Sequence, residues 1–154
     1  NALRRKPQII LVGEARDRET ISAAIEAAQT GHAVYTTTHT TGVASTVRRM
    51  ISAFEKEERS ERAYALMETL RMIVTQALVP KIGGGRVGVR EWMVFPDDIR
   101  EKLLDMDYEQ WSVEIQRMIP FYGQTMNKSA TIVFEQKIIE KRYYLLLTAG
   151  GGAG

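Results

Sequence analysis

One carboxylate and two imidazoles stand out as groups that could do chemistry. Glu14 follows four apolar residues and Gly13, so it comes where a buried strand should end. His32 and His39, the two histidines of the chain, flank a second short apolar stretch. Open α/β folds bind ligands at the carboxyl edge of a parallel sheet, where a carboxylate can accept a proton from water. Glu14 is therefore the leading candidate for a catalytic group.

The spacing of the two apolar stretches predicts which histidine lies near Glu14. Neighbouring parallel strands lie about 5 Å apart, so His39, beyond the carboxyl end of its strand, can reach the same crevice. His32 comes at the opposite end and is expected to hold structure or a subunit contact. We expect no metal site, because two histidines without cysteine and without H-E-x-x-H do not make a zinc centre.

The elements that must position these groups form a βαβ unit. Residues 9–12 are large, apolar and mostly β-branched, which predicts a strand buried on both faces. Asp17 is a good N-cap for a helix over residues 18–29, and a second strand follows at 32–37. A helix of this length between two strands requires a parallel pair with a right-handed crossover.

The rest of the chain alternates between helical and strand patterns. Helices are predicted at 43–54, 61–76, 97–104 and 107–119, with Pro120 ending the last of these, and strands at 77–82 and 86–95. Gly83, Gly84 and Gly85 are expected to form a hairpin turn, because no lysine and Ser/Thr follow at phosphate-loop spacing. Thr125 is expected to cap a final helical region.

Composition limits the class of protein but does not identify a function. The 154 residues carry 21 basic and 19 acidic side chains, a net charge of +2 that gives little support for a nucleic-acid surface. There is no cysteine and no apolar run near the roughly 20 residues that span a bilayer, so we expect a cytoplasmic chain. Because Asn1 is an unusual first residue, we expect an excised piece of a longer protein.

Two motifs carry a resemblance to a known family. I-I-L-V-G-E-A-R-D-R-E-T at residues 9–20 resembles the Walker B segment of the secretion and conjugation ATPases, and T-G-H-A-V-Y-T-T-T-H-T-T at residues 30–41 resembles their His box. L-R-R-K-P before the first strand and Y-G-Q-T at residues 122–125 are similar to the type IVB branch and its conjugal-transfer relatives. The resemblance covers only the C-terminal half of such an ATPase and implies an α/β fold: the C-terminal part of a RecA-like parallel-sheet ATPase core at 1–95, a small helical C-terminal subdomain at 96–149 and a flexible Gly-rich tail at 150–154.

The resemblance also implies roles for residues of the two motifs. Glu14 matches the Walker B glutamate, and His39 with Thr37 and Thr40 is expected to contact or sense the γ-phosphate region. Gly13 stands where many P-loop ATPases carry a metal-side aspartate, which leaves the metal dependent on water and on residues absent here.

Two arginines match positions where these ATPases keep arginine. For Arg16 two interpretations stay open: a part in the active-site network, or an ion pair with Glu19 or Asp17. Arg49 is interpreted mainly as a packing or interface residue.

The implied parent protein is a homohexameric motor that uses ATP and Mg2+ and serves an inner-membrane secretion or conjugation complex from the cytoplasmic side, without direct nucleic-acid contact. The chain holds no G-x-x-x-x-G-K-[ST], so it lacks the backbone nest and lysine that grip the phosphates. We expect it to be inactive alone. The alternative is a non-catalytic RecA-like interaction module.

Overall fold

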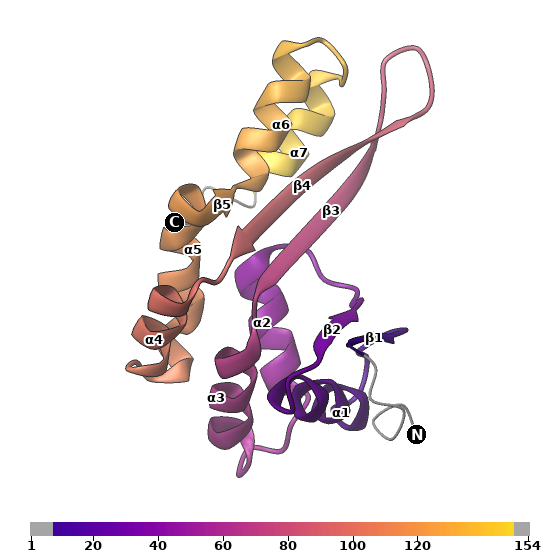
Figure 1. The fold of residues 1–154 in the computed structure, drawn as a ribbon. Coiled ribbons are helices and arrows are strands. Elements are labelled where there is room, and N and C mark those ends of the chain that lie inside the picture. Colours follow the sequence, from indigo (N-terminus) through magenta and orange to yellow (C-terminus); the bar gives the residue numbers. More distant parts are fainter. Residues whose placement is uncertain (1–7, 150–154) are drawn as a thin grey trace.

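The first two strands and the helix between them form the predicted βαβ unit. In a computed structural model, which describes residues 8–149, β1 (Ile9–Val12) pairs in parallel with β2 (Ala33–Thr36), and α1 (Arg18–Gln29) connects them (Figure 1). The register aligns Ile9 with Ala33 and Val12 with Thr36. The predicted α/β class and parallel pair are confirmed. The basic segment before Gln8 and the predicted tail at 150–154 lie outside the described residues.

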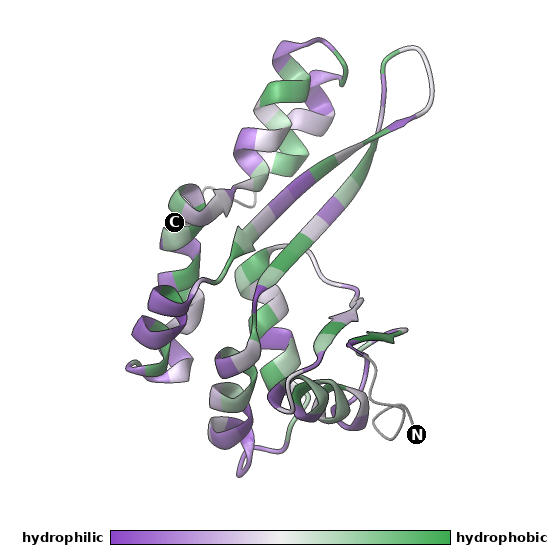
Figure 2. Ribbon diagram, in the orientation of Figure 1, coloured by the Kyte–Doolittle hydropathy of each residue, from purple (hydrophilic) through white to green (hydrophobic). Residues whose placement is uncertain are grey.

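The prediction that the first strand is buried on both faces is wrong. Ile9 and Leu11 on β1 are 63% and 78% exposed, and Tyr35 on β2 is 61% exposed. Side chains alternate across a strand, so these residues share one face, and no described element covers it. Figure 2 shows β1 in the apolar colour, although two of its four residues, Ile9 and Leu11, are exposed.

Two helices and a long hairpin follow. α2 (Val43–Ser52) and α3 (Arg59–Thr69) precede β3 (Met72–Pro80) and β4 (Arg86–Val94), which pair antiparallel. Gly83, Gly84 and Gly85 have φ values of +88°, +112° and +77°, which L side chains rarely adopt, and the predicted hairpin turn is confirmed.

The helix predicted to run to residue 76 ends at Thr69. Residues 72–76 instead begin β3, where buried Ile73 and Thr75 alternate with exposed neighbours. Their apolar content fits either a helix or a strand, and pairing with β4 decided between the two.

The remainder is helical except for one short strand. The elements are α4 (Asp97–Leu104), η2 (Tyr108–Gln110), α5 (Trp111–Tyr122), β5 (Gly123–Gln124), α6 (Met126–Glu135) and α7 (Lys141–Ala149). Pro120 lies inside α5, so the prediction that it ends the helix is wrong: the helix continues for two residues despite the missing donor. A Cβ on Gly123 would lie 1.8 Å from the Trp92 carbonyl oxygen, so the close approach of β5 to β4 needs glycine.

Apolar packing divides the molecule into two clusters. The basal cluster takes buried residues from α1 to α5 and the base of the hairpin, among them Met67, Phe95 and Trp111. The distal cluster consists of Val79, Val89, Ala130, Val133 and Ile139, where α6 packs on the far part of the hairpin (Figure 1). Helices α4 and α5 thus share a core with residues before 95, and the boundary predicted at that residue stays a prediction.

Candidate functional site

Glu14 and His39 lie side by side, as their places in the sequence predict. Glu14 immediately follows Gly13 at the end of β1, and its Oε1 lies 3.3 Å from His39 Nε2 and 3.3 Å from Arg16 Nε. The Glu14 side chain is 35% exposed, while those of Arg16 and His39 are 75% and 83% exposed. A half-buried carboxylate therefore meets two solvent-facing nitrogen groups, and it can exchange a proton with a water or ligand at the rim.

Two hydrogen bonds fix the spacing of the loops that carry this pair. The backbone N–H of Ala15 donates to the Thr37 carbonyl at 2.8 Å, and the Thr37 hydroxyl donates to the Gly13 carbonyl at 2.6 Å. They bracket Glu14 on both sides and extend the β1–β2 pairing beyond the ends of the strands. The hydroxyl of Thr37 is thereby committed to a backbone acceptor.

The end of the His39 loop is joined to the start of α2. The hydroxyls of Thr40 and Thr46 lie 2.6 Å apart, and Thr46 donates to the Gly42 carbonyl at 2.7 Å. Because Thr46 uses its proton on Gly42, Thr40 is the donor of the pair. Thr40 therefore holds the loop against the helix rather than presenting a free hydroxyl.

A polar cleft opens beside His39. Its volume is about 530 Å³, and it is lined by His39, Thr40, Thr41, Ser45, Arg48, Arg49 and Ser52. Arg48 and Arg49 are exposed on successive positions of α2, so the lining of the cleft combines two guanidinium groups with several hydroxyls. Guanidinium and hydroxyl groups of this kind suit phosphate or carboxylate oxygens. Sequence reasoning had not placed Arg48 or Ser45 here, although helical spacing puts both near the His39 loop.

The structure separates the alternatives for Arg16. Its described partner is Glu14, not Asp17 or Glu19. Asp17 instead caps α1, accepting from the backbone N–H of Thr20 at 2.8 Å, and this bond together with one from the Thr20 side chain lowers the pKa of the Asp17 carboxyl. Glu14 is thus not needed as the cap of α1. The catalytic or sensor roles of Glu14, His39, Gly13, Arg16, Thr37 and Thr40 stay predictions.

His32 lies apart from this group. Its Nδ1 is 3.0 Å from the Ala27 carbonyl oxygen and 3.0 Å from the Thr30 hydroxyl, at the C-terminal end of α1. The contacts tie the entry of β2 to the helix before it. They fit the predicted structural role.

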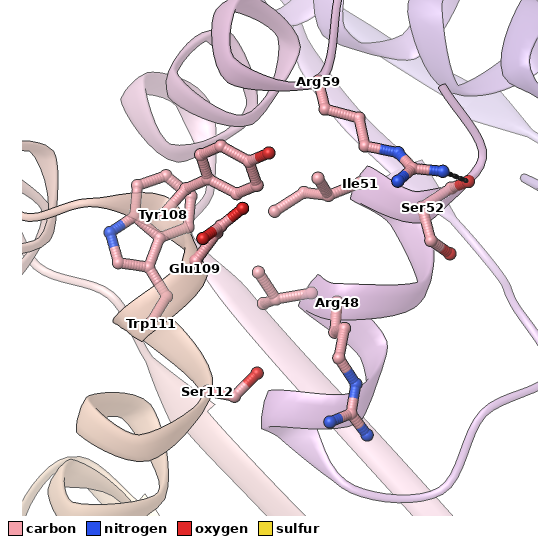
Figure 3. A pocket seen from close by; sticks show the side chains of 9 residues that line it. Arg48, Ile51, Ser52, Arg59, Tyr108, Glu109, Trp111 and Ser112 are labelled. Atoms are coloured by element: carbon pink, nitrogen blue, oxygen red, sulfur yellow. Dashed lines mark hydrogen bonds between the residues drawn. The ribbon is translucent and has the colours of Figure 1, made fainter. Parts of the chain in front are cut away.

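A second cleft, of about 270 Å³, separates α2 from η2 and α5 (Figure 3). Val47 and Ile51 line it from α2, with Trp111 opposite. Arg59 also lines it but donates to the carbonyls of Phe54 and Ser52 at 2.8 and 3.3 Å. None of the predicted site residues line this cleft. The cleft beside His39 is the better candidate.

The described residues fit one side of a magnesium–nucleotide site. Glu14 and Arg16 offer a carboxylate and a guanidinium beside the imidazole of His39, which lines the cleft. Gly13 supplies no carboxylate, and among residues 8–149 no three His, Asp or Glu side chains gather as metal ligands. No helix in that range is long and apolar enough to cross a bilayer.

Comparison with known proteins finds a family model and several similar proteins. Residues 1–84 match the model of the family described as "Type II/IV secretion system protein". The type IV pilus retraction ATPase PilT of Pseudomonas aeruginosa is 44% identical over 116 residues, which are 75% of this chain and 34% of the relative. A twitching motility protein of Neisseria gonorrhoeae is 36% identical over 140 residues, 90% of this chain and 37% of its own.

Solved structures of two ATPases are also similar to this chain. The ATPase DotB of Legionella pneumophila superposes with a TM-score of 0.91 at 48% identity, over 97% of this chain and 40% of its own. DotB of Yersinia pseudotuberculosis gives 0.90 at 38% identity, over 96% of this chain and 38% of its own. This chain therefore spans well under half the length of the relatives it matches.

Proposed function

The chain belongs to the type II/IV secretion system protein family, and on that premise we propose that it is the C-terminal part of an ATP-hydrolysing motor. The likeness to two DotB ATPases over nearly the whole chain supports the type IVB branch, whose motors power secretion or conjugal transfer. The observation that carries the proposal is the contact of Glu14 with both Arg16 and His39, because His39 also lines the cleft that holds Arg48 and Arg49.

Glu14 is proposed as the group that orients the attacking water and accepts its proton. The carboxylate is half-exposed, so water reaches it, and Arg16 and His39 hold Oε1 so that Oε2 is free of described ion pairs. His39 then lies between the carboxylate and the cleft, where it can sense the γ-phosphate. A bound magnesium ion neutralises charge on the phosphate oxygens. Because residue 13 is glycine and offers no carboxylate, that ion would depend on water and on residues outside this chain.

The sequence holds no phosphate-gripping loop, so the rest of the site must come from elsewhere in a longer protein. We propose that the parent chain supplies it, that six copies form a ring, and that the ring docks peripherally on the cytoplasmic face of an inner-membrane secretion or conjugation complex. Direct DNA handling is not proposed, since 21 basic and 19 acidic residues nearly balance.

The second candidate is a non-catalytic interaction module with the same scaffold. The missing G-x-x-x-x-G-K-[ST] is the observation in its favour. The two proposals differ in what a longer protein containing this segment does, because only the motor turns over ATP through Glu14.

The test measures ATP turnover of that longer protein with Glu14→Gln. General-base catalysis contributes about 100- to 10,000-fold, so kcat should fall by that factor. Glu19→Gln is the matched control, because Glu19 is an exposed glutamate of the first turn of α1 that has no described partner in the site. Equal turnover of the Glu14→Gln variant and the control contradicts the motor proposal. Calorimetry on the 154-residue chain alone should detect weak ATP binding or none.

A further inference from the structure

Glu91 is a buried carboxylate that joins the starts of two helices. It lies on β4, is 6% exposed, and no basic side chain within residues 8–149 forms an ion pair with it. Its Oε1 accepts from the backbone N–H of Val43 at 2.9 Å, and its Oε2 accepts from the backbone N–H of Met126 at 3.1 Å. These donors are the first residues of α2 and α6.

The start of α2 depends on the hairpin for its caps. Its N-cap, Gly42, has no side chain to accept from the first turn. The Gly42 N–H instead donates to the hydroxyl of Thr75 on β3 at 3.1 Å, and Thr75 donates to the Glu91 carbonyl at 3.2 Å. The helix dipole further favours a negative group at this end. Glu91 and Thr75 thus replace the cap that α2 does not carry.

The start of α6 is capped at two points. The Thr125 hydroxyl accepts from the Lys128 N–H at 3.1 Å, and Glu91 accepts from the N–H of Met126, two residues earlier. Both helices also contact β4, and Figure 1 shows α2 near the base of the hairpin and α6 farther along it. One carboxylate therefore bridges a helix of the basal cluster and a helix of the distal cluster.

Helix α2, which Glu91 contacts, is also linked to the loop that carries His39. Thr40 and Thr46 tie its first turn to the loop that carries His39, so a shift of that loop moves the Val43 N–H that Glu91 holds. We propose that Glu91 is a positioning residue that couples the His39 loop to the α6–α7 lobe. This rests on the proposed function, in which that loop senses nucleotide. The two backbone N–H groups at the helix starts also supply the hydrogen-bond donors that a buried carboxyl group needs.

Substitutions at Glu91 separate this coupling from ordinary packing. Alanine removes both acceptors. Glutamine keeps the shape but offers one acceptor oxygen, and its amide N–H2 faces the second donor, so it can hold only one helix start. Glu114 is the matched control: it is also a buried glutamate, at 8% exposed, but it pairs with Lys102 and Arg117 at 3.0 and 3.4 Å and touches neither helix start.

The first experiment needs no nucleotide. Amide hydrogen exchange of the 154-residue chain is followed at Val43 and Met126. Glu91→Ala should speed exchange at both amides by about tenfold, the factor that corresponds to about 1.4 kcal/mol. Glu91→Gln should speed exchange at only one of the two amides, and it is the variant to use if Glu91→Ala does not fold. The bridge is refuted if neither amide responds to either variant, or if Glu114→Gln has the same effect.

The second experiment follows the same amides in the longer protein, with and without ATP. ATP should change exchange at both Val43 and Met126 in the wild type, but only at Val43 in Glu91→Gln. A Met126 response that survives in the variant overturns the coupling. If ATP leaves Val43 unchanged in the wild type, the proposed contact of the His39 loop with nucleotide fails, while the first experiment still decides on the bridge.

Discussion

Replacing Thr37 with valine tests how the site is held together. The change removes the hydroxyl that donates to the Gly13 carbonyl at 2.6 Å and keeps the branched shape of the side chain. A hydrogen bond of this kind contributes about 0.5–1.5 kcal/mol, and the lower end applies because the pair is exposed and water can take the place of the hydroxyl. The melting temperature should therefore fall by only about 1–2 °C.

Activity should respond more than stability. The bond fixes the loop that carries His39 against the residue before Glu14, and small misplacements in a site can cost about 100-fold in rate. We expect kcat of the longer protein to fall roughly 10- to 100-fold, measured by phosphate release. Stability is followed by calorimetry in the same samples, so that a loss of folded protein is not mistaken for a loss of rate.

Thr36→Val is the matched control on the neighbouring residue. The Thr36 hydroxyl is buried and has no hydrogen-bond partner among the described residues, so its removal should be neutral or slightly stabilising. The reasoning is refuted if both variants lower kcat equally, or if Thr37→Val leaves kcat unchanged.

Two further predictions concern the scaffold. Trp111 is 1% exposed, and its Nε1 donates to the Leu103 carbonyl at 2.7 Å. Trp111→Phe should therefore lower the free energy of unfolding by about 1–3 kcal/mol, measured by chemical denaturation. An unchanged denaturation midpoint would contradict the packing of Trp111 in the basal cluster. The pKa of Asp17 is lowered in the folded state by its bonds from Thr20, so this contribution to stability is present above the ordinary carboxyl pKa and is lost as pH falls through the lowered one. Asp17→Ala should therefore melt below the wild type at neutral pH, and the difference in melting temperature should shrink as the pH falls through the lowered pKa of Asp17; a difference that does not change with pH would contradict the cap.

Much of the first half could be predicted from local pattern. An apolar run, a good N-cap at Asp17 and a second apolar run define a βαβ unit, and parallel pairing then requires Glu14 and His39 to meet at one edge. The proximity of these two side chains is confirmed at 3.3 Å. Local sequence pattern does not show whether another element packs on a sheet face. For that reason the sequence did not predict the exposure of Leu11.

The sequence-based predictions were wrong or incomplete where contacts between residues far apart in the sequence determine the structure. Residues 72–76 carry apolar side chains that fit two periods, and only pairing with β4 selects the strand. Glu91 was missed for a related reason: its donors, Val43 and Met126, lie 48 and 35 residues away in the sequence. A signal was present nonetheless, because Glu91 alternates with Val89 and Met93, both fully buried, and so falls on the inner face of its strand.

The central claim is that Glu14 and His39 act together on a nucleotide held by the parent protein. A double-mutant cycle with Glu14→Gln and His39→Ala, read as ATP turnover of the longer protein, measures it most directly. The account predicts that each single variant loses most of the activity and that the double variant loses little more. Losses that simply multiply would mean that the two residues act independently, and would contradict the account.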